Sequence, residues 1–145
     1  MISNVSQGLA PGTATPADAH AVLGNPERIA QNVVYGAVDR LEMHTYDTPQ
    51  GSLFFRDGKL VVFVLVPKPD SEFPLQIKAW EEALGKPDTK LPSIRGKNDR
   101  LWLWAAKGLT ATEDAGRVNL VEMFMPMRAE VYQKTLYKKP PVFIK

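Results

Sequence analysis

The 145-residue sequence has no cysteine, only two histidines and no apolar run long enough to cross a membrane. The absence of cysteine excludes disulfides, thiolate metal sites and cysteine nucleophiles, and it leaves the redox compartment open. A membrane helix needs about 18 or more consecutive apolar residues. Residues 1–16 also lack the basic and apolar regions of a signal peptide. We therefore expect no membrane insertion and a cytoplasmic protein, or a periplasmic one if an export signal preceded Met1.

An excess of charge of one sign is also missing. The chain has 18 basic and 16 acidic residues, a formal net charge of +2. Binding to nucleic acid by long-range attraction requires a strongly basic surface. The densest basic stretch, residues 86–100, is diluted by Asp88 and Asp99 and is interpreted as a solvated loop. We expect no nucleic-acid partner.

Catalytic and metal-binding motifs are scarce as well. Glu42, His44 and Tyr46 fall on one face of a single predicted strand. At a rise of about 3.3 Å per residue, alternate residues stand nearly 7 Å apart at the backbone, so we expect no ready Glu42–His44 hydrogen bond. This E-x-H pair supplies too few ligands for a metal site, and no phosphate-binding loop is present. The sequence predicts a protein that is not an enzyme and that has no metal site and no cofactor.

The sequence does contain internal similarity between its two halves. Three short segments of the first half return in the same order in the second half. They are "LGNPERI" (23–29) and "LGKPDTK" (84–90), "GAVDRL" (36–41) and "GKNDRL" (96–101), and "DGKLVVFVLVP" (57–67) and "AGRVNLVEMFMP" (115–126). Similar segments that recur in the same order predict a repeated supersecondary unit.

Each copy is predicted to be one helix followed by three strands. Thr15 is a suitable N-cap, and Gly24 and Gly85 end the two helices. Period-2 alternation predicts strands over 39–47 and 99–107. A short strand follows in each copy, "GSLFFRDG" (51–58) and "GLTATEDAG" (108–116), and ends in a hairpin turn, and the last strands are 59–67 and 117–126. The polar segments 24–38 and 86–99 are interpreted as connections. Because "LVVFVLV" is apolar on both faces, we expect it at the centre of the sheet.

The predicted fold is α+β. Two tandem repeats of one helix and three antiparallel strands form a six-stranded antiparallel sheet with both helices on one face. The divisions are a flexible segment 1–14, repeat 1 over 15–67, repeat 2 over 68–127 and a tail over 128–145. In the tail, Val131, Leu136 and Tyr137 indicate a helical turn, and "PVFIK" is a candidate cap for a sheet edge.

We expect the sheet face opposite the helices to bind a partner. The residues assigned to the helix side are Leu41, Met43, Leu101 and Leu103. The residues assigned to the open face are Glu42, His44, Tyr46, Trp102 and Trp104. Tryptophan and tyrosine dominate interface hot spots, whereas large aromatics in strands are also commonly core residues. Both interpretations of the two tryptophans stay open, as they do for the methionines of "MFMPM" (123–127), which suit core or an adaptable surface.

The repeat resembles that of the β-lactamase-inhibitor-protein-like superfamily. This group includes the tandem-repeat β-lactamase inhibitors and the small lipoprotein subunit of the bacterial outer-membrane assembly machine. The resemblance rests on the helix ends at 23–26 and 84–87 and on Gly58-Lys59 and Gly116-Arg117. The second copy also resembles immunity proteins encoded beside bacterial secreted toxins, such as those of type VI secretion.

The resemblance implies an immunity or inhibitor protein that occludes the active site of a cognate toxin. One alternative is an envelope-associated assembly module, and another is a small-ligand protein or enzyme that uses the Glu42/His44/Tyr46 face. Open edge strands also leave a homodimer possible, although Pro67 and Pro126 blunt such edges.

Overall fold

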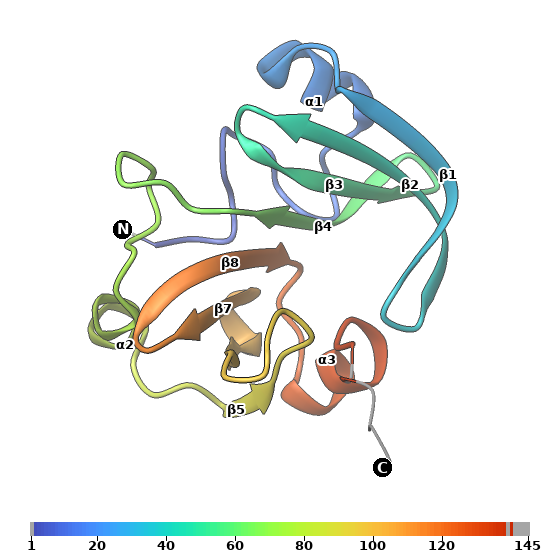
Figure 1. Ribbon diagram of the computed structural model, residues 1–145. Coiled ribbons are helices and arrows are strands. Elements are labelled where there is room, and N and C mark those ends of the chain that lie inside the picture. Colours follow the sequence, from blue (N-terminus) through green and yellow to red (C-terminus); the bar gives the residue numbers. More distant parts are fainter. Residues whose placement is uncertain (1, 139, 141–145) are drawn as a thin grey trace.

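The computed structural model describes residues 2–138 and 140, and it contains one eight-stranded antiparallel sheet in the order β1-β2-β3-β4-β8-β7-β6-β5 (Figure 1). The strands are β1 (Arg28–Tyr35), β2 (Val38–Asp47), β3 (Gln50–Arg56), β4 (Lys59–Leu65), β5 (Thr89–Pro92), β6 (Arg100–Trp104), β7 (Leu109–Asp114) and β8 (Arg117–Phe124). The helices are α1 (Pro16–Leu23), α2 (Ile77–Leu84), α3 (Ala129–Thr135) and a 3₁₀ turn, η1 (Ala105–Lys107).

The predicted six-stranded sheet built from two tandem repeats of a helix and three strands is wrong. The structure has a single eight-stranded sheet with three α-helices, because the segments interpreted as polar connections contain β1 and β5. Both are edge strands, which pair on one side only and need little apolar surface. β1 is mostly exposed and its register shifts twice, and β5 is only four residues long. The period-2 signal is therefore weak in both.

The first helix begins and ends where the sequence predicts. The Thr15 side chain accepts a hydrogen bond from the Asp18 amide at 3.2 Å, and the Asp18 carboxylate accepts one from the Thr15 amide at 2.9 Å. This capping box satisfies two amides that the first turn leaves without partners. Gly24 ends the helix at φ 81°, a conformation that favours glycine.

The second helix is held by an aromatic stack. Trp80 is fully buried, lies between Phe73 (ring centroids 5.6 Å apart) and Trp104 (5.9 Å), and donates from Nε1 to the carbonyl of Pro74 at 2.9 Å. No side chain of residues 2–138 or 140 caps the N-terminus of this helix. Packing of its apolar face therefore determines its position, as is usual for short helices.

β4 lies at the centre of the sheet, as predicted, between β3 and β8. Its pairing with β8 brings Val62 opposite Phe124 and Val64 opposite Glu122. Leu60 and Phe63 pack on one face of the sheet, and Val62 on the other. Burial on both faces explains the continuous apolar run of this strand.

Helices cover both faces of the sheet, not one. α1 and α2 pack with Tyr46, Trp102 and Trp104 in the larger core. α3 packs on the other face, where its Tyr132 contacts a cluster that contains Leu101 and Leu103. The helix side is thus the reverse of the one we expected, because alternation along a strand separates two faces without saying which elements cover each. α3 lies beside the β1–β2 turn (Figure 1).

The tail forms α3 over Ala129–Thr135, close to the predicted helical turn, and "PVFIK" lies outside the described residues. Within residues 2–138 and 140, no helix combines the length and apolarity that a membrane crossing requires.

We predict that Trp80→Ala lowers the free energy of unfolding by about 3–5 kcal/mol, because it removes a fully buried indole and leaves a cavity. Urea denaturation followed by circular dichroism measures the change. Val22→Ala is the control, since Val22 is 50% exposed on α1, and its effect should stay within about 0.5 kcal/mol. Equal effects of the two variants would contradict this account of the core.

Candidate functional site

A pocket of about 260 Å³ opens on the sheet face that carries α3. Its floor comes from the strands on both sides of the β4–β8 junction, and its walls come from the end of β1, the loop after β5 and the end of α3. The lining residues are Val34, Tyr35, Gly36, Val64, Ser93, Ile94, Arg95, Leu101, Thr112, Leu120, Glu122, Tyr132, Leu136, Tyr137 and Lys138. Concave apolar pockets with few polar groups are the usual form of binding sites.

The floor contains a buried carboxyl group, that of Glu122, whose residue is only 5% exposed. Thr110 Oγ1 donates to Glu122 Oε1 at 2.8 Å, Tyr132 donates to the same oxygen, and Tyr35 donates to Oε2. These three hydroxyls come from β7, α3 and β1. Burial of a carboxyl without such partners is costly, and the hydroxyls offset part of that cost.

The surroundings of Glu122 change its acid–base properties. Burial raises the pKa of the Glu122 carboxyl, and the hydrogen bonds from Tyr132, Tyr35 and Thr110 lower it by less. Burial and the charge of Glu122 raise the pKa values of Tyr35 and Tyr132 well above their ordinary value. The two phenols therefore stay neutral donors, and Glu122 is the group of the cluster that titrates.

Sequence reasoning missed Glu122. The only signal is one acidic residue inside the apolar run of β8, between Val121 and Met123. Alternation places Glu122 on the α3 face while its two neighbours join the core under α1 and α2. The three hydroxyls reach it from distant parts of the chain, so no local pattern reveals the cluster.

The walls of the pocket are joined by close contacts. A side chain at Gly36, whose φ is 62°, would overlap the carbonyl oxygen of Thr135, while the Ala37 amide donates to that oxygen at 2.7 Å. Tyr137 donates its hydroxyl to the carbonyl of Pro92 at 2.6 Å. The end of α3 is therefore attached to the β1–β2 turn on one side and to β5 on the other.

The rim combines apolar and basic side chains. Val34 is 60% exposed and Ile94 is 49% exposed. Arg95 and Lys138 are exposed too, and neither forms a salt bridge with any residue that the structure describes. The rim thus offers apolar contact area and two cations that pair with no acidic side chain in the described part of the chain.

The residues expected to bind a partner lie elsewhere, on the α1/α2 side. His44, Tyr46, Trp102 and Trp104 are at most 8% exposed, and Glu42 is partly exposed. The hydroxyl of Tyr46 and the indole N–H groups of Trp102 and Trp104 form hydrogen bonds within the protein. Tyr46 and Trp104 donate to the carbonyls of Gly24 and Gly85 at the helix ends, and Trp102 donates to Glu113, each at 2.9 Å. These side chains stabilise the core, and their role in partner binding stays an untested prediction.

Glu42 and His44 are hydrogen-bonded, contrary to our expectation. His44 Nε2 lies 2.6 Å from Glu42 Oε2, because the long glutamate side chain spans the gap between their backbones. Gln31 donates to Glu42 Oε1 at 2.7 Å, and the hydrogen bonds from Gln31 and then His44 lower the pKa of the Glu42 carboxyl.

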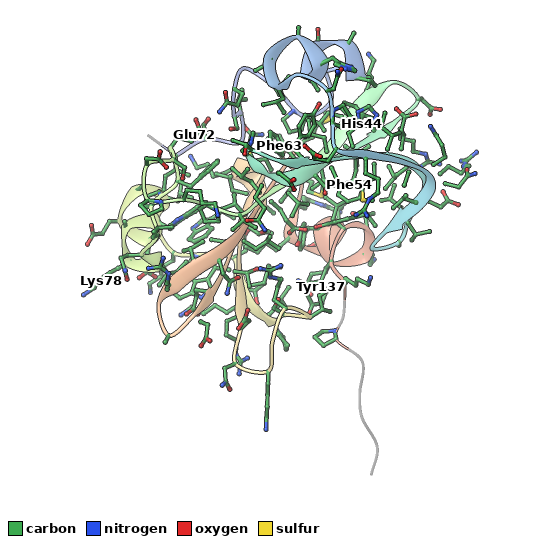
Figure 2. All side chains as sticks on the ribbon, turned by 45° about the horizontal axis from the view of Figure 1, so that its top comes forward. His44, Phe54, Phe63, Glu72, Lys78 and Tyr137 are labelled. Carbon is green, nitrogen blue, oxygen red and sulfur yellow. The ribbon has the colours of Figure 1, made fainter. Side chains whose placement is uncertain are left out.

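The imidazole of this pair is not accessible. His44 lies on the α1 side of the sheet (Figure 2). Its ring packs edge-on against Phe55, and its Nδ1 is buried without a hydrogen-bond partner among the described residues. A general base must reach its substrate, and His44 does not line the pocket beside α3. Among residues 2–138 and 140, no three His, Cys, Asp or Glu side chains gather as metal ligands would.

Comparison with known proteins identifies the fold and no more. No protein-family model and no curated protein matches the sequence. A DUF4309 family protein (YjgB) from Bacillus subtilis is 17% identical, with a TM-score of 0.54 over 86% of each chain. An extracellular protein containing an SCP domain from Bacillus anthracis is 14% identical, with a TM-score of 0.53 over 92% of this chain and 50% of that one.

The present chain therefore spans about half the length of the second neighbour. At these identities the similarity shows a shared fold and carries no activity across. Neither neighbour bears on the resemblance to β-lactamase inhibitors or immunity proteins, which stays a prediction.

We predict that Glu122→Gln gains stability relative to the wild type as the pH rises. The folded-state pKa of Glu122 is raised above its ordinary value of 4.5. The stabilisation linked to its proton is therefore fully present below pH 4.5 and is lost as the pH rises through the folded-state pKa. Urea unfolding of both proteins between pH 4 and 8 measures this trend, and a difference that is independent of pH would contradict it.

Glu42→Gln should show the opposite trend. The pKa of Glu42 is lowered from 4.5 in the folded state. The contribution of ionised Glu42 to the stability of the fold is therefore present above pH 4.5 and is lost as the pH falls through the folded-state pKa. The same urea-unfolding series, extended to pH 3, should find this variant less stable than the wild type near neutrality. The difference between their free energies of unfolding should shrink as the pH is lowered. A gap that widens in acid would contradict the assignment.

Proposed function

We propose that this protein is a non-catalytic binding module that recognises a partner protein with the pocket face of its sheet. One observation carries the proposal: the pocket beside α3 has a polar group at its floor and exposed apolar side chains, Val34 and Ile94, at its rim. Apolar side chains around a concavity extend contact beyond a small ligand, as at protein interfaces. A partner that inserts a side chain and covers the rim would use both features.

The partner we propose is a bacterial toxin, which this protein inhibits as a cognate immunity protein by occluding the active site. The support is the resemblance of the second half of the sequence to immunity proteins. The near-balanced charge, +2 overall, favours an interface of apolar anchors with a polar rim over a mimic of nucleic acid. We place the protein in the cytoplasm, or in the periplasm if an export signal precedes Met1, and assign it no cofactor.

The experiment tests both the partner and the face. The protein is co-expressed with the product of the neighbouring gene, and the complex is isolated and measured by calorimetry. Ile94→Asp and Val34→Asp should each weaken binding at least about tenfold, because each places a charge in a desolvated contact. Val22→Asp is the matched control, since Val22 is equally exposed but lies on α1.

The outcomes separate the alternatives. Binding that survives both rim variants and is lost in Val22→Asp would move the interface to the α1 face. A partner that belongs to envelope assembly would replace the immunity assignment with the accessory-module alternative. The absence of any complex with a neighbouring gene product would remove the immunity proposal.

A further inference from the structure

The floor of the pocket holds an acidic group and its rim holds basic ones. Glu122 lies at the floor, and Arg95 and Lys138 lie at the rim. Between them the walls are mainly apolar, with Val64, Leu101 and several other aliphatic side chains. A ligand that matches this order has a hydrogen-bond donor or cation at its tip, an apolar stem, and acidic groups around its base.

The hydrogen bonds of Glu122 leave room for one more donor. An ionised carboxylate accepts about four hydrogen bonds, two on each oxygen. Thr110 and Tyr132 both donate to Oε1, whereas Tyr35 is the one donor to Oε2 among residues 2–138 and 140. The free acceptor position on Oε2 therefore suits a single donor from the pocket.

A lysine ammonium fits this floor better than an arginine guanidinium. The guanidinium fork binds a carboxylate through both oxygens at once, and Oε1 of Glu122 already has two donors. An ammonium is a compact charge on a flexible four-carbon stem. Its stem would lie against the apolar walls, as lysine stems do on apolar surfaces, while its head meets Oε2.

The basic side chains of the rim favour acidic residues on both sides of that lysine. Arg95 and Lys138 form no salt bridge among the described residues, and both line the pocket together with the exposed Val34 and Ile94. Acidic residues that flank an inserted lysine would pair with them. Opposite charges across an interface select the partner and its register.

We infer that the pocket binds a lysine side chain that a partner protein presents within an acidic segment, with Glu122 as the group that receives the ammonium. This inference rests on the proposed function and specifies the chemistry of the same site.

Binding of the lysine is coupled to loss of the Glu122 proton. The titratable and charged groups around the carboxyl are Tyr35 from β1, Tyr132 and Tyr137 from the α3 segment, and Arg95 and Lys138 from the rim. The phenols of Tyr35, Tyr132 and Tyr137 stay neutral, because their pKa values are raised. Since only the ionised carboxylate attracts an ammonium, affinity should rise with pH across the range in which Glu122 titrates.

Two peptides test the inference. One is acetyl-EEKEE-amide, and the other has norleucine in place of its lysine, which keeps the stem and removes the charge. NMR titration of the wild-type protein at pH 7.5 should show the lysine peptide binding at least about tenfold more tightly, the effect of one charge-assisted hydrogen bond. The lysine preference should shrink as the pH is lowered to 5.

Variants locate the effect. Glu122→Gln should remove the preference for lysine over norleucine and its pH dependence. Arg95→Gln is the control, because it should weaken both peptides equally and leave their ratio unchanged. The comparison of the two peptides on the wild-type protein remains decisive even if Glu122→Gln does not fold.

Equal binding of the two peptides, or no binding by either, would overturn the lysine inference. The proposed function fails separately. If Ile94→Asp weakens a partner complex but the two peptides bind with equal affinity, the proposed binding function is supported and the lysine inference is wrong. If no partner complex forms and the lysine preference is found, the pocket chemistry stands and the proposed partner falls.

Discussion

The pairing of β4 with β8 is the interaction on which the remaining structure depends. β1–β4 and β5–β8 are two antiparallel meanders, and these two strands are where they join into one sheet (Figure 1). Four register pairs make the junction, among them Val62 with Phe124 and Val64 with Glu122. A four-stranded meander with one short helix buries little apolar surface, so the joined sheet is what gives each half a two-sided core. The pocket floor lies on this junction.

The helices cover the two faces of the sheet unequally, and the pocket lies on the less covered face. One face lies under α1, α2 and the N-terminal segment, and its core includes three stacked or tilted tryptophans. In the part of the chain that the structure describes, the other face has α3 alone, which is seven residues long. α3 covers Leu101, Leu103 and Phe124 and stops at the β1–β2 turn. Among the described residues, nothing covers the pocket that lies between the end of α3 and the loop after β5.

Local patterns in the sequence predict local structure well and tertiary placement poorly. Thr15, Asp18 and Gly24 mark the first helix because capping and positive φ depend on adjacent residues. β1 and β5 escape prediction because an edge strand needs no apolar face. Trp102 and Trp104 are placed on one face by alternation, but whether that face is core or surface depends on α2, which packs on them from elsewhere in the chain.

Glu122 illustrates the same limit at the site and also shows why the site is distinctive. A single glutamate in an apolar strand has the same local pattern whether its side chain faces solvent or three hydroxyls. Its partners come from β1, β7 and α3, and leucine at this position would avoid the cost of burying a carboxyl. Glu42 carries a smaller cost, since its side chain is 32% exposed beside His44. A buried carboxyl that titrates at the floor of an open pocket is the arrangement that binding sites favour, and here it lies where the two halves of the sheet meet.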